Sequence, residues 1–243
     1  MTTAAAIIVA AGKGVRMGPN TDKIFLPVAG RPVVAHTWER FDRAPCVSDI
    51  ILVIREGMES AFKELAATLH LTKPCRFVNG GKERQDSVWN GLQALDPAAQ
   101  IVAIQDAARP CTGAELIAAT IQAAEEMGAA VAAQPLTDTV KQSDDGVLIA
   151  RHLDRSRLWA VQTPQTFRVE VIRRALAKVR DQGIQVTDDT AACELIGQSV
   201  KLVPSPHPNP KITAPIDVPY VEMLLNRIHA VEQAQLIQLH GYG

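Results

Sequence analysis

Short, almost unbroken apolar runs recur along the chain and alternate with longer amphipathic stretches. The runs cover residues 5–10, 49–54, 75–78, 101–105, 129–134 and 199–203. Such runs are typical of parallel strands that helices cover on both faces. Two of the intervening stretches repeat apolar residues at helical spacing, namely Met58, Phe62, Leu65 and Leu69, and Val88, Leu92 and Leu95. The pattern therefore predicts an α/β fold with a doubly wound, mostly parallel sheet.

No repeat or low-complexity linker interrupts this alternation, so the 243 residues predict a single domain. One segment departs from the pattern, because residues 138–160 alternate polar and β-branched side chains around an Asp-Asp-Gly turn signal. This favours an extended hairpin over a core helix, and the pattern alone favours a plain solvated surface hairpin over an arm that reaches a partner. From about residue 216, Val221, Leu224, Leu225 and Ile228 share one helical face and predict a C-terminal helix docked on the sheet or on a partner.

The composition narrows the function classes. With 25 basic and 26 acidic residues the net charge is −1, which gives no general attraction to nucleic acid or to anionic lipid. The cysteines, at positions 46, 75, 111 and 193, show no metal-ligand or C-x-x-C spacing, so we expect reduced thiols. The N-terminal apolar run is too short for an anchor and follows no basic segment, which predicts a cytoplasmic protein without a signal peptide.

In a doubly wound sheet the ligand site lies beyond the carboxyl ends of the strands. The first loop there reads AAGKGVRMGPNTDK, in which Gly12 and Gly14 let the backbone present N–H groups to a phosphate. Three cations follow closely: Lys13, Arg16 and Lys23. They suggest chemistry at phosphorus, where a protein mainly positions groups and stabilises charge, although ordinary solvated surface charge explains lone basic residues equally well.

Two common nucleotide motifs are missing. A dinucleotide fingerprint requires glycine or alanine where the chain has Met17, and an acidic residue at the end of the second strand, where it has Arg55. The glycine loop also lacks the G-K-[ST] ending of a P-loop. These absences argue against an NAD-dependent dehydrogenase.

Other predicted strands also end in polar residues. Gly80, Gly81 and Ser87 follow the third run, and Asp106 and Arg109 follow the fourth. Asp106 is a candidate ligand for Mg²⁺ or for a ribose hydroxyl, while its alternative role is a turn or helix cap. Several polar loops that meet at one edge of a sheet indicate a binding site more strongly than any one of them alone.

Taken together, the motifs resemble the 2-C-methyl-D-erythritol 4-phosphate cytidylyltransferases over residues 5–225. The matching segments are AAGKGVRM with Lys23, GGKERQDSV, QDAARP, TDTVK, LDR with LW and TPQTF, and KIT at 211–213. The related ribitol-phosphate cytidylyltransferases share most of them, but typically read A-G-G in the first loop and D-A-V-R-P in the fourth. Ala11 and Ala108 favour the methylerythritol family. The resemblance implies a Rossmann-like nucleotidyltransferase fold with an extended β-arm.

The resemblance implies transfer of a cytidylyl group from CTP to methylerythritol phosphate, with Mg²⁺ and with pyrophosphate as leaving group. By the same resemblance, Arg16 and Lys23 stabilise charge on the α-phosphate in the transition state. The glycines of the first loop wrap the triphosphate, and the remaining nucleotide contacts come from Ala10, Ala11, Gly80, Gly81 and Ser87. A ribitol-phosphate cytidylyltransferase and a non-catalytic CTP-binding module are the alternatives.

The resemblance also implies an acceptor site made by Asp106, Arg109, Thr139, Thr163, Thr187 and Lys211. Arg155 is expected to enter it from a second subunit, which implies a homodimer with exchanged arms. Lys211 is the weakest of these assignments, because Pro210 precedes it where the family usually has a hydrophobic residue.

Overall fold

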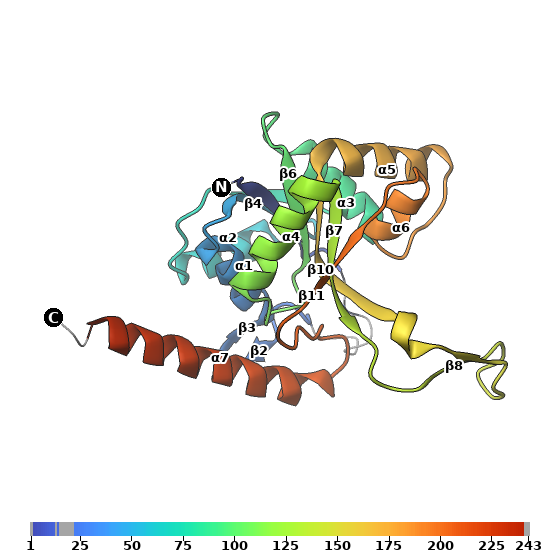
Figure 1. Cartoon of the computed structure of the whole chain (residues 1–243). Helices are drawn as coiled ribbons and strands as arrows, with labels where there is room; N and C mark the ends of the chain where they lie inside the picture. The colour runs from blue at the N-terminus through green and yellow to red at the C-terminus, as the bar shows by residue number, and fades with distance from the viewer. Residues whose placement is uncertain (1, 13, 15–21, 241–243) are drawn as a thin grey trace.

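A seven-stranded sheet forms the centre of the computed structural model, which describes residues 2–12, 14 and 22–240 (Figure 1). Along the chain its strands are β1 (Ala4–Val9), β4 (Val47–Ile54), β5 (Cys75–Asn79), β6 (Ile101–Asp106), β7 (Ala129–Pro135), β10 (Trp159–Arg168) and β11 (Lys201–Pro204). Their order in the sheet is β11-β7-β10-β6-β1-β4-β5. Strand β10 runs antiparallel to β6 and β7, and the other neighbouring pairs are parallel, so the predicted mostly parallel sheet is confirmed.

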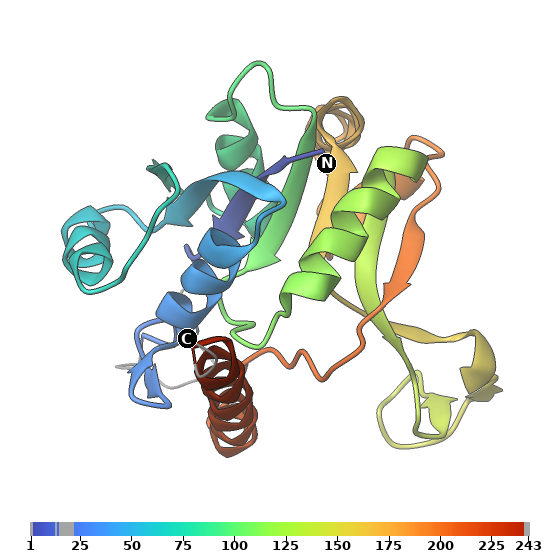
Figure 2. The same ribbon diagram turned by 60° about the vertical axis from the view of Figure 1, so that its left-hand side comes forward.

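Helices cover both faces of this sheet, as predicted. One face carries α1 (Val33–Arg43), α2 (Glu59–Ala67) and α4 (Ala114–Met127), and the other carries α3 (Arg84–Gln93), α5 (Val169–Asp181) and α6 (Asp189–Glu194). Figure 2 shows α1 and α4 lying along one face, with α5 beyond the sheet. Strand β1 serves both layers, because Ala6 and Ile8 point into the first core while Ala5 and Ile7 point into the second.

Strand β10 is absent from the predicted strands, and its composition explains why. Gln162, Thr163, Gln165 and Thr166 are polar and yet at most 8% exposed. Each makes at least one hydrogen bond inside the protein, which lowers the cost of burying it. The register with β7 shifts between Val161 and Gln165, and this irregularity accommodates Pro164 within a central strand.

The region predicted as an arm contains a separate two-stranded hairpin of β8 (Val140–Gln142) and β9 (Arg151–Leu153), followed by the 3-10 turn η2 (Arg155–Arg157). The predicted segment ends at residue 160, but Trp159 and Ala160 already belong to β10 in the main sheet. Figure 1 shows the hairpin projecting from the body. Its end exposes three consecutive apolar residues, Val147, Leu148 and Ile149, by 82%, 70% and 69%.

The C-terminal helix α7 (Asp217–His240) docks on its own chain. Val221 and Leu225 are fully buried in a small third core with Val28 and Ile212. The helix thereby packs against the turn between β2 (Pro27–Val28) and β3 (Arg31–Pro32). It also packs against Ile212 in the loop that precedes the helix.

This turn contains an uncommon backbone conformation. Ala29 has φ +48°, in the left-handed region that favours glycine, and Gly30 follows at φ +78°. The N–H of Ala29 donates to Glu222 Oε1 of α7 at 3.0 Å. The C-terminal helix therefore helps to hold a turn that lies a few residues after Lys23.

None of the helices in the described part of the chain combines the length and apolar character needed to cross a bilayer. The cysteines at 46, 75, 111 and 193 are all free thiols, and burial raises the pKa of Cys75, Cys111 and Cys193 to about 12. These thiols are therefore protonated and poorly reactive at neutral pH.

Candidate functional site

A cleft of about 510 Å³, called the main cleft below, opens at the carboxyl edge of the sheet. Loops after β1, β5 and β6 line it, as expected where parallel strands end at one edge. The lining residues are 9–12, 23–24, 81–84, 87, 106–108 and 211. They include eight predicted site residues, which come from distant parts of the sequence: Ala10, Ala11, Gly12, Lys23, Gly81, Ser87, Asp106 and Lys211.

Two glycines allow close contacts in the loop after β5, one with the loop after β1 and one with the start of α3. A Cβ on Gly80 would lie 2.3 Å from the Cβ of Ala11, and a Cβ on Gly81 would lie 2.3 Å from that of Asp86. No other residue fits at either position without a shift of its neighbours. The N–H of Gly81 donates to the hydroxyl of Ser87 at 3.1 Å, which fixes this nearly buried side chain at the cleft wall.

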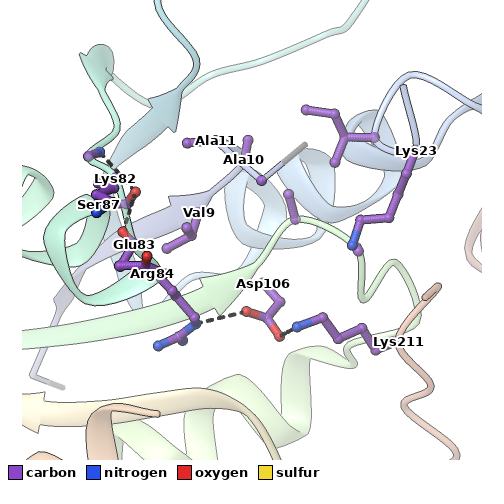
Figure 3. Close-up of a pocket in the computed structure, with 15 residues that line it drawn as sticks. Val9, Ala10, Ala11, Lys23, Lys82, Glu83, Arg84, Ser87, Asp106 and Lys211 are labelled. Carbon is purple, nitrogen blue, oxygen red and sulfur yellow. Dashed lines mark hydrogen bonds and ion pairs between the residues drawn. The ribbon is translucent and has the colours of Figure 1, made fainter. Parts of the chain in front are cut away.

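Lys23 enters the main cleft from the opposite side to Ser87 (Figure 3). Its neighbour Ile24 is buried and accepts a hydrogen bond from the N–H of Val34 at 2.9 Å, so the backbone beside Lys23 is anchored to the start of α1. Gly14 has φ +63°, and a Cβ there would come within 3.0 Å of Lys23 Cβ. Arg16, the other predicted catalytic cation of this loop, lies outside the described residues.

Asp106, at the end of β6, is the centre of the charged part of the cleft. Its carboxylate lies 2.7 Å from Lys211 Nζ and 3.4 Å from Arg84 Nε (Figure 3). Arg109 Nε lies 3.7 Å from the same carboxylate. Burial alone would raise the pKa of Asp106, but the three cations outweigh it and hold that pKa well below its usual range. The carboxylate is therefore ionised at any working pH.

The loop that carries Lys211 is held by a buried network, in spite of Pro210. Asn209 is 2% exposed, and its side-chain amide donates to the carbonyl of Thr163 at 2.8 Å. Its own carbonyl accepts a hydrogen bond from Arg109 at 2.6 Å. On the other side of Lys211, the N–H of Ile212 donates to the carbonyl of Ala108 at 2.9 Å. These bonds bring Lys211 against Asp106.

A second cavity of about 250 Å³, the side cleft, shares a wall with the main cleft. The shared residues are Arg84, Asp106 and Lys211. The remaining lining includes three further residues predicted for the acceptor, Arg109, Thr163 and Thr187. The hydroxyl oxygen of Thr163 accepts the N–H of Asp106 at 3.1 Å, so the two clefts are also connected by a hydrogen bond.

Four of the predicted site residues that the structure describes line neither cleft of this chain, namely Gly14, Gly80, Thr139 and Arg155. Thr139 is exposed just before β8, and Arg155 in η2 is exposed and donates to the carbonyl of Thr137. Both lie on or beside the projecting hairpin, so neither contributes to a cleft of its own chain.

Arg84 is the residue that the sequence-based prediction missed. It is the first residue of α3, and its guanidinium contacts Asp189 Oδ2 at 2.7 Å as well as Asp106. Burial would lower its pKa, but Asp189 and Asp106 outweigh that effect and raise it. The one sequence signal is its position three residues after Gly81 at a helix start, where a basic residue is not needed by the helix.

The clefts therefore present main-chain groups and a serine on one side and converging cations on the other. Three cations from separate segments surround one ionised carboxylate, and Lys23 lines the same cleft, an arrangement that suits a ligand with several phosphate groups. Within the described residues, no group of three or more His, Cys, Asp or Glu side chains is arranged to hold a metal ion.

Comparisons with known proteins agree with this geometry. A model of the 2-C-methyl-D-erythritol 4-phosphate cytidylyltransferase family matches residues 4–227. The chain is 45% identical over 220 residues to 2-C-methyl-D-erythritol 4-phosphate cytidylyltransferase of Symbiobacterium thermophilum, covering 90% of this chain and 91% of the relative. It is 43% identical over 226 residues to the bifunctional enzyme IspD/IspF of Desulforudis audaxviator, covering 93% of this chain but 57% of that longer protein.

Among solved structures, that of 4-diphosphocytidyl-2C-methyl-D-erythritol synthase from Anaerococcus prevotii superimposes with a TM-score of 0.82. It is 32% identical in sequence, and the match covers 93% of this chain and 96% of the other.

Proposed function

The chain belongs to the 2-C-methyl-D-erythritol 4-phosphate cytidylyltransferase family, and from this premise we propose a role for each cleft. The main cleft binds CTP, the side cleft binds methylerythritol phosphate, and the cytidylyl group passes between them to give 4-diphosphocytidyl-2-C-methyl-D-erythritol and pyrophosphate. The observation that carries this assignment is the wall of Arg84, Asp106 and Lys211 that both clefts share, because the two reacting phosphates must meet at such a junction.

The reaction needs no covalent enzyme intermediate. A phosphate oxygen of the acceptor attacks the α-phosphorus of CTP, the new P–O bond forms, and the bond to the β-phosphate breaks as pyrophosphate leaves. Both reactants are anionic, so cations at the junction offset their repulsion and the charge that grows on the α-phosphate. Lys23 and Lys211 line the main cleft and suit this role, and a preorganised donor of this kind contributes roughly 3 to 4 kcal/mol.

Base recognition belongs to the other end of the main cleft. Gly80 and Gly81 leave no room for side chains, and the hydroxyl of Ser87 is fixed beside them. A narrow slot bounded by backbone groups of Ala10 and Ala11 suits a pyrimidine, whose edge is read by hydrogen bonds, better than a purine. Arg16 would join Lys23 at the triphosphate.

Nucleotidyltransferases generally use a divalent metal, and for this chain we assign that role to Mg²⁺. Magnesium is commonly held by one or two carboxylates together with substrate phosphates. Asp106 is a carboxylate at the junction, which fits such a partial donor set, although its oxygens already face Lys211 and Arg84. The ion would therefore arrive with the triphosphate, where it supplies charge neutralisation to the leaving pyrophosphate.

The working unit is a homodimer with exchanged arms. Arg155 and Thr139 line neither cleft of their own chain, and they lie on or beside a hairpin that projects from the body. Three exposed apolar residues at the end of this hairpin, Val147, Leu148 and Ile149, would be covered by a second copy. In such a dimer each side cleft receives Thr139 and Arg155 from the partner. We place this dimer in the cytoplasm, where the four free thiols stay reduced.

The test of the reaction is pyrophosphate release from CTP and Mg²⁺, with methylerythritol phosphate or ribitol phosphate as acceptor and with UTP and ATP as nucleotide controls. We expect release with CTP and methylerythritol phosphate alone. Release with ribitol phosphate alone would keep the mechanism and change the acceptor. CTP binding without release with either acceptor would favour a non-catalytic binding module.

The exchanged arm is tested by complementation. Arg155→Ala and Lys23→Ala should each be inactive, but hybrid dimers contain one site in which both residues are intact. Mixing the two variants should therefore restore activity. After random subunit exchange up to about a quarter of all sites would be intact, and up to about half if every dimer were a hybrid. If subunit exchange is verified by mass spectrometry and no activity returns, Arg155 does not act across the interface.

A further inference from the structure

Arg84 connects three parts of the protein at the junction of the two clefts. It starts α3, its Nε lies 3.4 Å from Asp106 at the end of β6, and its Nη1 donates to Asp189 in α6 at 2.7 Å. A planar guanidinium can serve two carboxylates at once in a fixed geometry, whereas a lysine ammonium acts as a single point charge. The side chain is 27% exposed, so part of it faces the clefts.

Burying the carboxylate of Asp189 at this position costs free energy. It is 0% exposed, and one of its carboxylate oxygens, Oδ1, has no hydrogen-bond partner. Its other oxygen bonds to Arg84, and its backbone N–H donates to Gln165 at 3.0 Å. A buried carboxylate with a single cationic partner contributes little net stability, because its desolvation offsets the attraction. We therefore look for the role of Asp189 in its contact with Arg84 rather than in stability.

We propose that Asp189 is a positioning residue that aims Arg84, and that Arg84 in turn fixes Asp106 between the two substrates. The proposal rests on the assignment of the two clefts given above. Without Asp189, the long and flexible Arg84 side chain is free to turn toward any phosphate in the main cleft. It would then bind CTP in the ground state, where extra binding does not accelerate the reaction.

The first test is Asp189→Asn, which keeps the shape and removes the charge. We expect kcat to fall by about tenfold to a hundredfold, as small misplacements at a reacting centre do, while the KM for CTP does not rise. Arg84→Lys should give a similar loss, because a point charge cannot bridge both carboxylates. The double variant should be no worse than either single one, since both changes break the same link.

Asp42 offers a matched control. It is another nearly buried carboxylate, 2% exposed, and it accepts the N–H groups of Thr72 and Lys73 at 2.9 to 3.0 Å, away from both clefts. Asp42→Asn should lower the melting temperature through loss of a buried charged acceptor and leave kcat and both KM values unchanged. A fall in kcat with Asp189→Asn but not with Asp42→Asn separates positioning from general destabilisation.

A second readout does not depend on turnover. In the arginine side-chain ¹⁵N–¹H spectrum, the Nε–H signal of Arg84 is identified by its loss in Arg84→Lys. We expect this signal to be sharp and slowly exchanging in the wild type and in Asp42→Asn, but broadened or fast-exchanging in Asp189→Asn.

The outcomes separate the two proposals. If the wild-type protein releases no pyrophosphate, the assigned reaction fails, while the spectra still decide whether Asp189 orders Arg84. If the wild type is active and folded Asp189→Asn keeps wild-type kcat, or if the Arg84 signal is unchanged in that variant, the positioning role is wrong. Should Asp189→Asn fail to fold, wild-type kcat in folded Arg84→Lys would overturn it equally.

Discussion

The sheet carries clefts of similar size at its two ends, and they use arginine differently. The main cleft at the carboxyl edge measures about 510 Å³, and a cleft at the opposite, amino edge measures about 600 Å³. At the carboxyl edge the cations face one carboxylate, Asp106. At the amino edge Arg168 donates to the carbonyl of Glu125 at 2.6 Å, and Arg173 to that of Leu92 at 2.8 Å.

Cleft volume alone therefore does not identify a functional site. Arginines that bond backbone carbonyls satisfy the protein's own orphan acceptors and hold helix and strand ends in place. Cations gathered around an ionised carboxylate that lines an open cleft place their charge where a ligand can reach it, although Arg109 also donates to the carbonyl of Asn209. The direction of the side chains, and the number of separate loops that supply them, distinguish the carboxyl edge from the amino edge.

Lys23→Ala should have the largest effect, and it tests most directly whether a cation of the carboxyl edge takes part in the reaction. It removes a cation proposed to stabilise transition-state charge, so turnover should fall on the order of a hundredfold or more without loss of the fold. Lys82→Ala is the matched control, because Lys82 lines the same cleft but is exposed. Steady-state pyrophosphate release measures both, and a Lys23→Ala rate within a few-fold of wild type would reject Lys23 as a catalytic group.

Gly80→Ala should have a smaller effect at the same edge. The new methyl group would lie 2.3 Å from Ala11 Cβ and force two cleft loops apart. We expect a loss of about 1 to 3 kcal/mol in the free energy of unfolding and a rise in the KM for CTP. Gly113→Ala is the control, since a Cβ there meets nothing within 4 Å and Gly113 lines neither cleft. An unchanged KM for CTP with Gly80→Ala would show that this close approach does not shape the nucleotide slot.

Arg173→Met at the amino edge should have the smallest effect. It tests whether the arginines of the amino edge have a structural role only. It removes one hydrogen bond to Leu92 and keeps the apolar stem of the side chain, so we expect a loss of about 1 kcal/mol in unfolding free energy. Turnover should stay within twofold of wild type. A large loss of turnover with little change in thermal stability would mean that the amino edge takes part in function.

Parts of the molecule could be predicted from the sequence because local patterns determine them. The apolar runs at 5–10 and 101–105 correspond to β1 and β6, since strands buried on both faces leave a continuous signal. The family itself could be predicted from motif order, and the comparisons confirm it. The glycine pair at 80 and 81 also indicates a close approach in the sequence, and the structure places that approach against Ala11 and Asp86 of the chain itself.

Other parts could not be predicted, because tertiary contacts determine them. Strand β10 looks polar along the sequence, and only its hydrogen bonds to other elements make its burial favourable. Arg84 and Asp189 are 105 residues apart, and nothing in the sequence near either residue indicates that the two are paired. Their pairing follows from α3 and α6 lying on the same face of the sheet, which no local pattern reports.

The wall shared by the two clefts has a consequence for how the enzyme can diverge. Arg84, Asp106 and Lys211 line both cavities, so under the proposed assignment of the clefts a substitution there would alter the binding of both substrates. Gln162, Thr163 and Thr187 line the side cleft but not the main cleft. New acceptor specificities should therefore evolve through β10 and the segment before α6, while the wall itself stays unchanged under selection. For the same reason, an inhibitor that spans both cavities would leave the enzyme few routes to resistance that preserve turnover.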